Sequence, residues 1–309
     1  RRWIRRSLIA FGVMALLFAL TLYVAIPAML PSAIVYAPNT KATIDPRADR
    51  VPKELARARH LRITVGPPKA TLSCLLLAPD KGRPPRGTIL VFHGIRDNKR
   101  SQLGTAKHLA NKGFRVLLVD HRGHGRSSGR YLTYGVRESA DMVQVLDLLQ
   151  SRGGLARPVA ALGYSYGGAV ALQLAARDKR IAAVATVATF ASLRDVLGSY
   201  VRRYIPLVGR LVSQSTLDEA LSRAGELASF DPALADNRRA AAARSLPRLL
   251  LHGASDAKIP VAHAHAIEHA AKGPSELIVI PEANHVTIFS DHGATVRRHI
   301  DTFFDRWLR

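Results

Sequence analysis

Short apolar runs alternate with longer amphipathic stretches along the chain after residue 60. The apolar runs have the length of strands and read HLRITVG, ATLSCLLLAP, GTILVFHG, FRVLLVD, RPVAALG, RIAAVATVAT, RLLLHG and ELIVI. PPKA forms a turn between the first two, and helical stretches such as SQLGTAKHLANKG separate later ones. Continuous apolar runs are typical of strands buried on both faces. The pattern therefore predicts a mostly parallel sheet covered by helices, an α/β fold.

One interval in this alternation, residues 190–247, is longer than a single crossover helix needs, so we expect an inserted helical cap in a domain of residues 60–309. Near its start, apolar residues recur at three- and four-residue steps, which predicts one helix stripe. The stripe consists of Leu193, Val196, Leu197, Tyr200, Val201, Tyr204 and Ile205, and it is edged by Arg194, Arg202 and Arg203. Such a stripe can cover an apolar pocket as a lid, rest on anionic lipid, or pack on the domain core.

The N-terminal segment, residues 1–40, has a different pattern. RRWIRR carries four arginines, and no charged residue follows from Ser7 to Thr40. The apolar stretch SLIAFGVMALLFALTLYVAIPAML would form about 36 Å of helix at ~1.5 Å per residue, enough to span a bilayer. A cleaved signal peptide is the alternative, but its apolar core has only about 7–15 residues. We therefore expect an uncleaved single-pass anchor.

The distribution of basic residues around that stretch predicts its orientation. Arginines precede the span and the next basic residue is Lys41, which places the N-terminus in the cytoplasm and the domain beyond the membrane, in the periplasm of a bacterium. Residues 41–59 are polar, contain Pro46 and Pro52, and suit a tether between membrane and domain.

The composition adds a strong positive charge, +22 from 45 Lys and Arg against 23 Asp and Glu. The basic residues are scattered and no DNA- or RNA-binding motif occurs among them, so we expect no nucleic-acid partner. Attraction to anionic lipid agrees with the apolar N-terminal segment. Cys74 is the single cysteine of the sequence, which excludes an internal disulfide and a cysteine-based metal cluster.

One serine is enclosed by residues with almost no side chain. The sequence G-Y-S-Y-G, residues 163–167, lies where the strand RPVAALG gives way to the helix YGGAVALQLAA. A serine at the tip of such a sharp turn has a strained backbone and projects above the sheet. Gly163 and Gly167 occupy positions where a Cβ would strike the neighbouring strand or helix. The pattern predicts that Ser165 is a nucleophile, with helix-start N–H groups favouring negative charge beside it.

A serine hydroxyl becomes a strong nucleophile only when a base takes its proton and an acid orients that base. Asp256 in LLLHGASDAKIP follows a buried strand, and His285 in VIPEANHVTIF follows the last apolar run. Both residues and Ser165 therefore follow carboxyl ends of strands, where ligands bind in open α/β sheets. We predict a triad of these three residues, with Asp231 or Asp291 as the alternative acid.

An acyl-transfer site also needs donors for the oxyanion of the tetrahedral intermediate. The backbone N–H of Tyr166, directly after the serine, is one candidate. The second is the N–H of Ile95, in the loop after GTILVFHG, where we expect His93 and Gly94 to support the loop.

Two other patterns are weaker. Gly123-x-Gly125 with Gly129 follows a strand like a dinucleotide fingerprint, but its third glycine comes one place late. His263, His265 and His269 in VAHAHAIEHA have helical spacing. No Glu or Asp completes a recognisable set of metal ligands with them, so we expect these histidines on a solvated helix face. We predict no cofactor and no metal.

The motifs VFHGIRDNK, DHRGHGRSSG, GYSYGG, LLHGASDAKIP and the terminal NH resemble, in order, those of the α/β-hydrolase superfamily. The resemblance covers residues 60–309 and is strongest to membrane-anchored hydrolases like serine aminopeptidases and monoacylglycerol lipases. It implies an eight-stranded sheet, cofactor-free hydrolysis, and structural roles for Asp120 and Arg122. The cap resembles no substrate-defining lid.

The expected function is a membrane-anchored serine hydrolase. Its substrate would be a small ester or thioester, lipid-like and with an apolar acyl group, cleaved through an acyl-enzyme. A peptidase or amidase is the alternative among enzymes. A catalytically silent, membrane-tethered binding protein is the alternative from another class.

Overall fold

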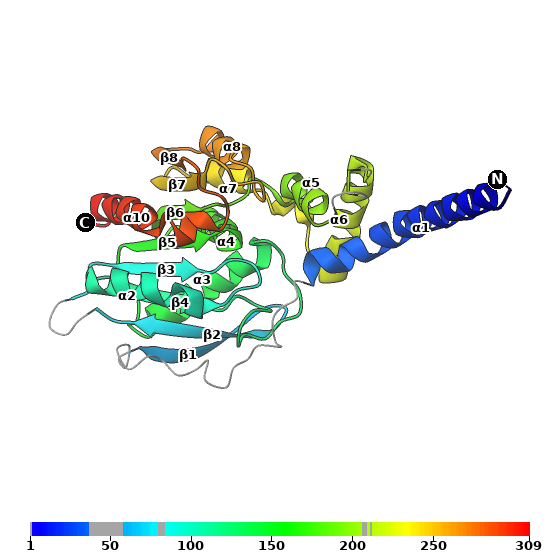
Figure 1. Cartoon of the computed structure of the whole chain (residues 1–309). Coiled ribbons are helices and arrows are strands. Elements are labelled where there is room, and N and C mark those ends of the chain that lie inside the picture. Colours follow the sequence, from blue (N-terminus) through cyan, green and yellow to red (C-terminus); the bar gives the residue numbers. More distant parts are fainter. Residues whose placement is uncertain (1, 37–57, 80–83, 206–208, 211) are drawn as a thin grey trace.

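The computed structural model describes residues 2–36, 58–79, 84–205, 209–210 and 212–309. Within these residues one sheet contains eight strands in the order β1-β2-β4-β3-β5-β6-β7-β8 (Figure 1). The strands are β1 (Arg59–Val65), β2 (Ala70–Leu77), β3 (Thr88–Phe92), β4 (Arg115–Val119), β5 (Val159–Tyr164), β6 (Ile181–Val187), β7 (Arg248–Gly253) and β8 (Ser275–Ile280). Strand β2 pairs antiparallel with β1 and β4, and the other neighbours are parallel. The mostly parallel, eight-stranded sheet is therefore confirmed.

Helices cover both faces of the sheet because successive side chains of a strand point to opposite faces. In β3, Leu90 and Phe92 belong to the core cluster with α3 (Val136–Ser151) and α4 (Tyr166–Arg177), and α8 (Ala262–Ala270) joins this cluster. Ile89 and Val91 belong to the cluster with α2 (Leu103–Asn111) and α10 (Gly293–Trp307). Burial on both faces explains why the strands appear in the sequence as unbroken apolar runs.

The described residues between β6 and β7 form four helical elements, α5 (Leu193–Tyr204), α6 (Gln214–Ala228), η5 (Pro232–Leu234) and α7 (Asn237–Ala243). We call residues 190–247 the insertion. The apolar stripe of α5 has two environments. Leu193, Val196, Leu197 and Val201 are buried in the core cluster, whereas Tyr204 is 59% exposed. Among the edging arginines, Arg194 pairs with Asp218 of α6, with 2.7 Å between Nε and Oδ1.

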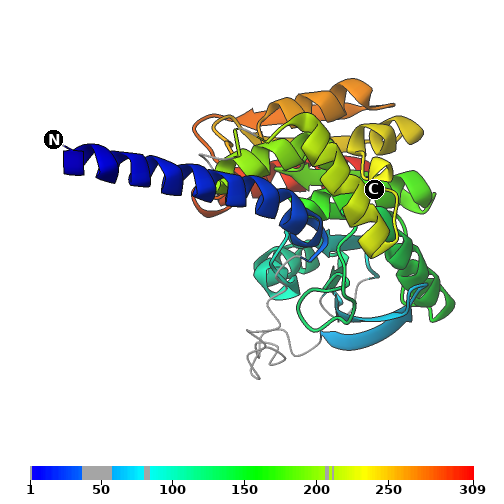
Figure 2. The ribbon, with the colours of Figure 1, turned by 90° about the vertical axis from the view of Figure 1, so that its right-hand side faces the viewer.

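The expected N-terminal helix is present as α1 (Arg2–Val35), which projects from the body of the molecule (Figures 1 and 2). Its last turns belong to the domain. Leu30, Ile34 and Val35 are buried in the core cluster. The Tyr134 hydroxyl donates to the carbonyl of Ile34 (2.7 Å), and the Leu132 N–H donates to that of Val35 (3.0 Å). The last turns of the segment that we predicted as an anchor, residues 1–40, therefore also pack on the predicted domain of residues 60–309.

Among the helices in the part of the chain that the structure describes, none is both long and apolar enough to cross a membrane. The predicted membrane span is therefore not confirmed. The predicted tether, residues 41–59, lies outside the described residues except for its last two positions.

Candidate active site

The turn between β5 and α4 holds Ser165 in a strained backbone conformation, with φ 52° and ψ −115°. A non-glycine residue rarely adopts such a positive φ, and the surrounding structure must maintain it. The neighbouring glycines allow the turn to close. A Cβ added to Gly163 would lie 2.1 Å from the carbonyl oxygen of Gly167, and one added to Gly167 would lie 2.5 Å from that of Phe92. Both positions are as crowded as the sequence indicates.

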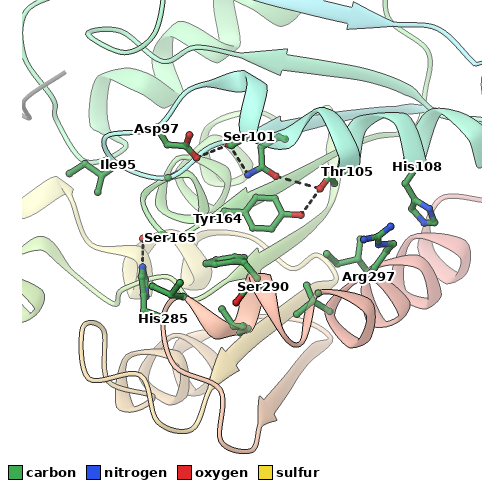
Figure 3. A pocket seen from close by; sticks show the side chains of 18 of the residues that line it. Ile95, Asp97, Ser101, Thr105, His108, Tyr164, Ser165, His285, Ser290 and Arg297 are labelled. Carbon is green, nitrogen blue, oxygen red and sulfur yellow. Dashed lines mark hydrogen bonds between the residues drawn. The ribbon is translucent and has the colours of Figure 1, made fainter. Parts of the chain in front are cut away.

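The loops after β5, β7 and β8 bring the three predicted triad residues together, and Figure 3 shows two of them, Ser165 and His285. Ser165 Oγ lies 3.2 Å from His285 Nε2, and His285 Nδ1 lies 2.7 Å from Asp256 Oδ2. Because a carboxylate only accepts, Nδ1 carries the hydrogen and Nε2 is left to accept the serine hydroxyl. The arrangement can therefore remove a proton from Ser165.

The Asp256 side chain is buried and fully bonded. Its Oδ1 accepts the backbone N–H groups of Lys258 (2.9 Å) and Ile259 (2.8 Å), while Oδ2 faces His285. Burial by itself raises the pKa of this carboxyl. The hydrogen bond and charge of His285, with the N–H of Ile259, outweigh it, so the pKa lies below its usual value. Asp256 is therefore the ionised partner that holds the imidazole.

The two alternative candidates for the triad acid, Asp231 and Asp291, bond to other groups. Asp231 caps η5 by accepting the N–H of Ala233, and Asp291 accepts the hydroxyl of Ser290.

The loop after β3 lies beside the serine, and a Cβ added to Gly94 would be 3.8 Å from Ser165 Cβ. Ile95 and Ser165 line the same cavity. Tyr166 is the first residue of α4, where backbone N–H groups have no partner within the helix. Both candidate oxyanion donors therefore belong to segments next to Ser165.

His93 supports this loop from beneath, as the sequence indicates. Its Nδ1 lies 2.7 Å from the Gly94 carbonyl and must donate, while Nε2 accepts the His121 N–H (3.2 Å). Burial lowers the pKa of His93, which remains neutral and keeps both bonds.

Comparison with known proteins decides the family. A sequence profile of the family described as alpha/beta hydrolase fold matches residues 87–205. The Uncharacterized protein YfhR of Escherichia coli is 30% identical over 70% of this chain and 69% of its own length. A Monoacylglycerol lipase of Mycolicibacterium smegmatis is 24% identical over 65% of this chain and 81% of its own. An esterase of Pyrococcus furiosus matches in structure with TM-score 0.65 and 21% identity, covering 84% of this chain and 95% of its own.

The chain belongs to the α/β-hydrolase superfamily. The relatives therefore confirm the resemblance inferred from the motifs.

In this α/β hydrolase, motif reading missed His252, at the end of β7. Its Nε2 donates to the Ile259 carbonyl (2.7 Å) and lies 3.6 Å from Asp256 Oδ2. Burial lowers the pKa of His252, so the ring stays neutral. It closes the loop that presents Asp256. The sequence offered one indication of this role, since His252 lies in the LLHGASD motif four residues before Asp256.

Motif reading also missed a cluster of buried rings that packs against His93 of the loop after β3. His121 and His124 pack against His93, with ring centroids 4.9 and 5.0 Å apart, and against Tyr166. Burial and the neighbouring His93 lower the pKa of His124 to about 4 and that of His121 well below its ordinary value. The cluster is therefore neutral and packs as a set of aromatic rings.

The glycine pattern that resembles a dinucleotide fingerprint folds around a buried ion pair. Lys99 Nζ lies 2.5 Å from Asp120 Oδ2, and a Cβ on Gly125 would strike the Asp120 carboxylate at 2.4 Å. Arg122 makes two hydrogen bonds to Asp141, of 2.7 and 2.6 Å. Asp120 and Arg122 therefore stabilise this loop.

The helix-face prediction for the three histidines of α8 is wrong for His263. Its side chain is buried, and its Nδ1 accepts the N–H of Ala191 (3.2 Å) at the start of the insertion. It is buried because the insertion packs over that end of α8, which helical spacing alone does not reveal. His265 and His269 are exposed. Among the described residues, no three His, Cys, Asp or Glu side chains are placed to hold a metal ion.

A cavity of about 570 Å³ contains Ser165 and His285 and extends between α2 and α10 (Figure 3). One wall is polar and carries a hydrogen-bonded series, in which Ser101 donates to Asp97 (2.6 Å) and Thr105 lies 3.3 Å from the Tyr164 hydroxyl. The other wall carries the apolar side chains of Val286, Ile288 and Phe289 together with Ser290 and Arg297. We call this the α2/α10 cavity. It has the size of a small-molecule site.

Proposed function

We propose that the protein is a serine hydrolase that cleaves a carboxylic ester or thioester with an apolar acyl group through an acyl-enzyme. The observation that carries the proposal is the hydrogen-bond series from Asp256 through His285 to Ser165, at the edge of a substrate-sized cavity. These three residues are proposed as the catalytic triad.

In acylation, Ser165 Oγ attacks the carbonyl carbon of the ester and its proton passes to His285 Nε2. Asp256, held ionised, stabilises the imidazolium that forms. When the tetrahedral intermediate collapses, the bond to the leaving oxygen or sulfur breaks, and His285 returns the proton to it. The alcohol or thiol leaves and the acyl group remains on Ser165.

In deacylation, water attacks the acyl carbon and gives its proton to His285 Nε2. The bond to Ser165 Oγ then breaks, Oγ takes the proton back, and the carboxylic acid departs. In both steps the backbone N–H groups of Ile95 and Tyr166 are the proposed donors to the oxyanion, with His93 keeping the first of them in place.

The test is labelling with a fluorophosphonate, which transfers its phosphonyl group to an activated serine with loss of fluoride. The native protein should be labelled and should hydrolyse 4-nitrophenyl esters, and Ser165→Ala should lose labelling and at least roughly 10³-fold in kcat. Ser101→Ala, a change to another serine of the cavity, should remain labelled. Full esterase activity in Ser165→Ala would refute the assignment, and an unlabelled native protein would favour a silent binding protein.

Membrane attachment through α1 stays a prediction, and so does an extracytoplasmic position of the domain. Its support is the apolar sequence after the N-terminal arginines, together with the exposed side chains of Trp3, Leu8, Phe11 and Phe18. Exposed apolar surface of this extent marks an interaction site. Flotation of the full chain with anionic vesicles, in parallel with Phe11→Asp and Phe18→Asp, tests attachment. A native chain that stays at the bottom of the gradient would contradict it.

A further inference from the structure

A second cavity, of about 300 Å³, lies beside the candidate triad on the side of the insertion. We call it the α1/α5 cavity, because the last turns of α1 and one side of α5 form much of its wall. These two helices contribute mainly aliphatic and aromatic side chains, among them Leu30, Ala33 and Ile34 of α1 and Leu197, Val201 and Tyr204 of α5. The C-terminal part of the α5 stripe therefore lines a space, and it includes Leu197 and Val201, which also pack in the core cluster.

The two cavities share residues at the candidate active site. Ile95 and Lys258 line both of them. Ile95 is in the proposed oxyanion loop, and Lys258 donates its backbone N–H to Asp256. Ser165 lines the α2/α10 cavity, and the α1/α5 cavity adjoins that cavity at Ile95 and Lys258.

Among the described residues that line the α1/α5 cavity, two side chains are charged, Arg96 and Lys258. Both come from the loops that carry Ile95 and Asp256, whereas the helices contribute no charged group to the wall. A pocket of this kind suits a hydrocarbon chain whose polar end lies at the loops. It does not suit a charged or strongly polar group along its length, because burial of such groups without partners is costly.

The wall formed by α1 is a fixed part of the fold. Tyr134 lines the cavity, and its hydroxyl holds the Ile34 carbonyl at 2.7 Å. Leu30 and Ile34 are buried, so this wall is packed against the domain. Ala33 and Tyr204 are exposed as well as lining the cavity, which places its mouth at the surface between α1 and α5.

We propose that the α1/α5 cavity binds the acyl chain of the substrate, and that the N-terminal helix is therefore one wall of the substrate site. The acyl group is a straight chain of medium length, because about 300 Å³ is at the lower end of ligand pockets. The alcohol leaves through the α2/α10 cavity. This inference rests on the proposed function.

The test compares isomeric esters that place the same hydrocarbon on opposite sides of the carbonyl, methyl octanoate and heptyl acetate. In the full-length chain, Ala33→Phe fills the mouth of the cavity and Ala33→Leu fills it less. We expect kcat/KM for methyl octanoate to fall roughly ten- to hundredfold in Ala33→Phe and by less in Ala33→Leu, with heptyl acetate unaffected. Ala28→Phe, the same change at an exposed position of α1 outside the cavity, should affect neither ester.

The outcomes separate the two proposals. An unchanged methyl octanoate rate in both Ala33 variants, an equal fall for both esters, or a fall for heptyl acetate alone would overturn the acyl-chain assignment and leave the hydrolase intact. A native protein that hydrolyses neither ester and is not labelled at Ser165 would overturn the proposed function, and this inference with it. Melting curves of the variants show whether Ala33→Phe is folded, and Ala33→Leu supplies the answer if it is not.

Discussion

The carboxyl edge of the sheet and the insertion present opposite kinds of surface to two adjoining cavities. At the sheet edge, buried polar groups make specific pairs such as the Asp256 to His285 bond and the Lys99 to Asp120 ion pair. The insertion presents apolar side chains of α5 to a cavity, and residues 190–247 contain no histidine.

The difference indicates a division of labour. Directional bonds hold reacting groups within a narrow geometry, which catalysis requires. Contacts between apolar side chains are not directional. A cavity wall made of them can therefore select substrates by length and shape without holding any one atom in a narrow position. Changes at the sheet edge should therefore affect every substrate or the whole fold, and changes in the insertion should separate one substrate from another.

The largest effect is expected for Asp256→Asn. The amide preserves the shape of the side chain but favours the wrong tautomer of His285, so kcat should fall by roughly 10⁴ for all esters alike. Steady-state kinetics on 4-nitrophenyl acetate and octanoate measure it. Asp291→Asn, at the exposed alternative acid, should retain native rates. If Asp291→Asn lost activity and Asp256→Asn kept it, Asp291 would be the acid of the triad.

The next effect concerns stability. Lys99→Met leaves the Asp120 carboxylate buried without its ion-pair partner, so the free energy of unfolding should fall by about 3–5 kcal/mol. Lys112→Met, which breaks the more exposed contact of 3.5 Å with Asp301, should cost less than about 1 kcal/mol. Urea unfolding of both variants gives the comparison, and similar losses would show that Lys99 contributes no more than a surface charge.

The buried histidines predict a pH dependence of stability. In the unfolded chain histidine takes up a proton below about pH 6.5, whereas His124 in the folded protein does so only near its pKa of about 4. This contribution to stability is therefore present above about pH 6.5 and is lost as the pH falls toward about 4. For each such histidine, the free energy of unfolding falls by up to about 1.4 kcal/mol for every unit by which the pH decreases in that window.

Urea unfolding between about pH 7 and pH 5 checks this dependence. His124→Gln should reduce the slope of stability against pH, whereas His265→Gln, at an exposed position, should leave it unchanged. A slope that is the same in His124→Gln and in the native protein would contradict the account.

The smallest and most selective effect is expected at Tyr204. Because Tyr204 lines the α1/α5 cavity but is exposed, Tyr204→Asp should lower kcat/KM for 4-nitrophenyl octanoate by about tenfold and leave acetate and the melting temperature nearly unchanged. Leu197 belongs to the same predicted stripe as Tyr204 but is only 5% exposed. Leu197→Asp should therefore lower the melting temperature as well, because it buries a charge. Leu227→Asp, elsewhere in the insertion, is the control. An equal fall of kcat/KM for both esters in Tyr204→Asp would show that the stripe packs on the core and does not select the acyl chain.

The sequence by itself determined the sheet, the strand positions and the residues of the candidate triad. Unbroken apolar runs identify buried strands. The turn around Ser165 is recognisable because only glycine fits at Gly163 and Gly167, so local sterics leave a clear trace in the residue types. Asp256 and His285 could be selected because carboxyl ends of parallel strands share one edge.

Only the tertiary structure decided where the remaining surfaces lie. It placed the end of α1 in the core and in the wall of a cavity, buried His263 under the insertion, and packed His121 and His124 against His93. These outcomes depend on contacts between segments far apart in the chain. A residue type states how favourable burial would be, but not which distant segment will bury it, and a helix stripe has the same period whether it meets a core or a cavity.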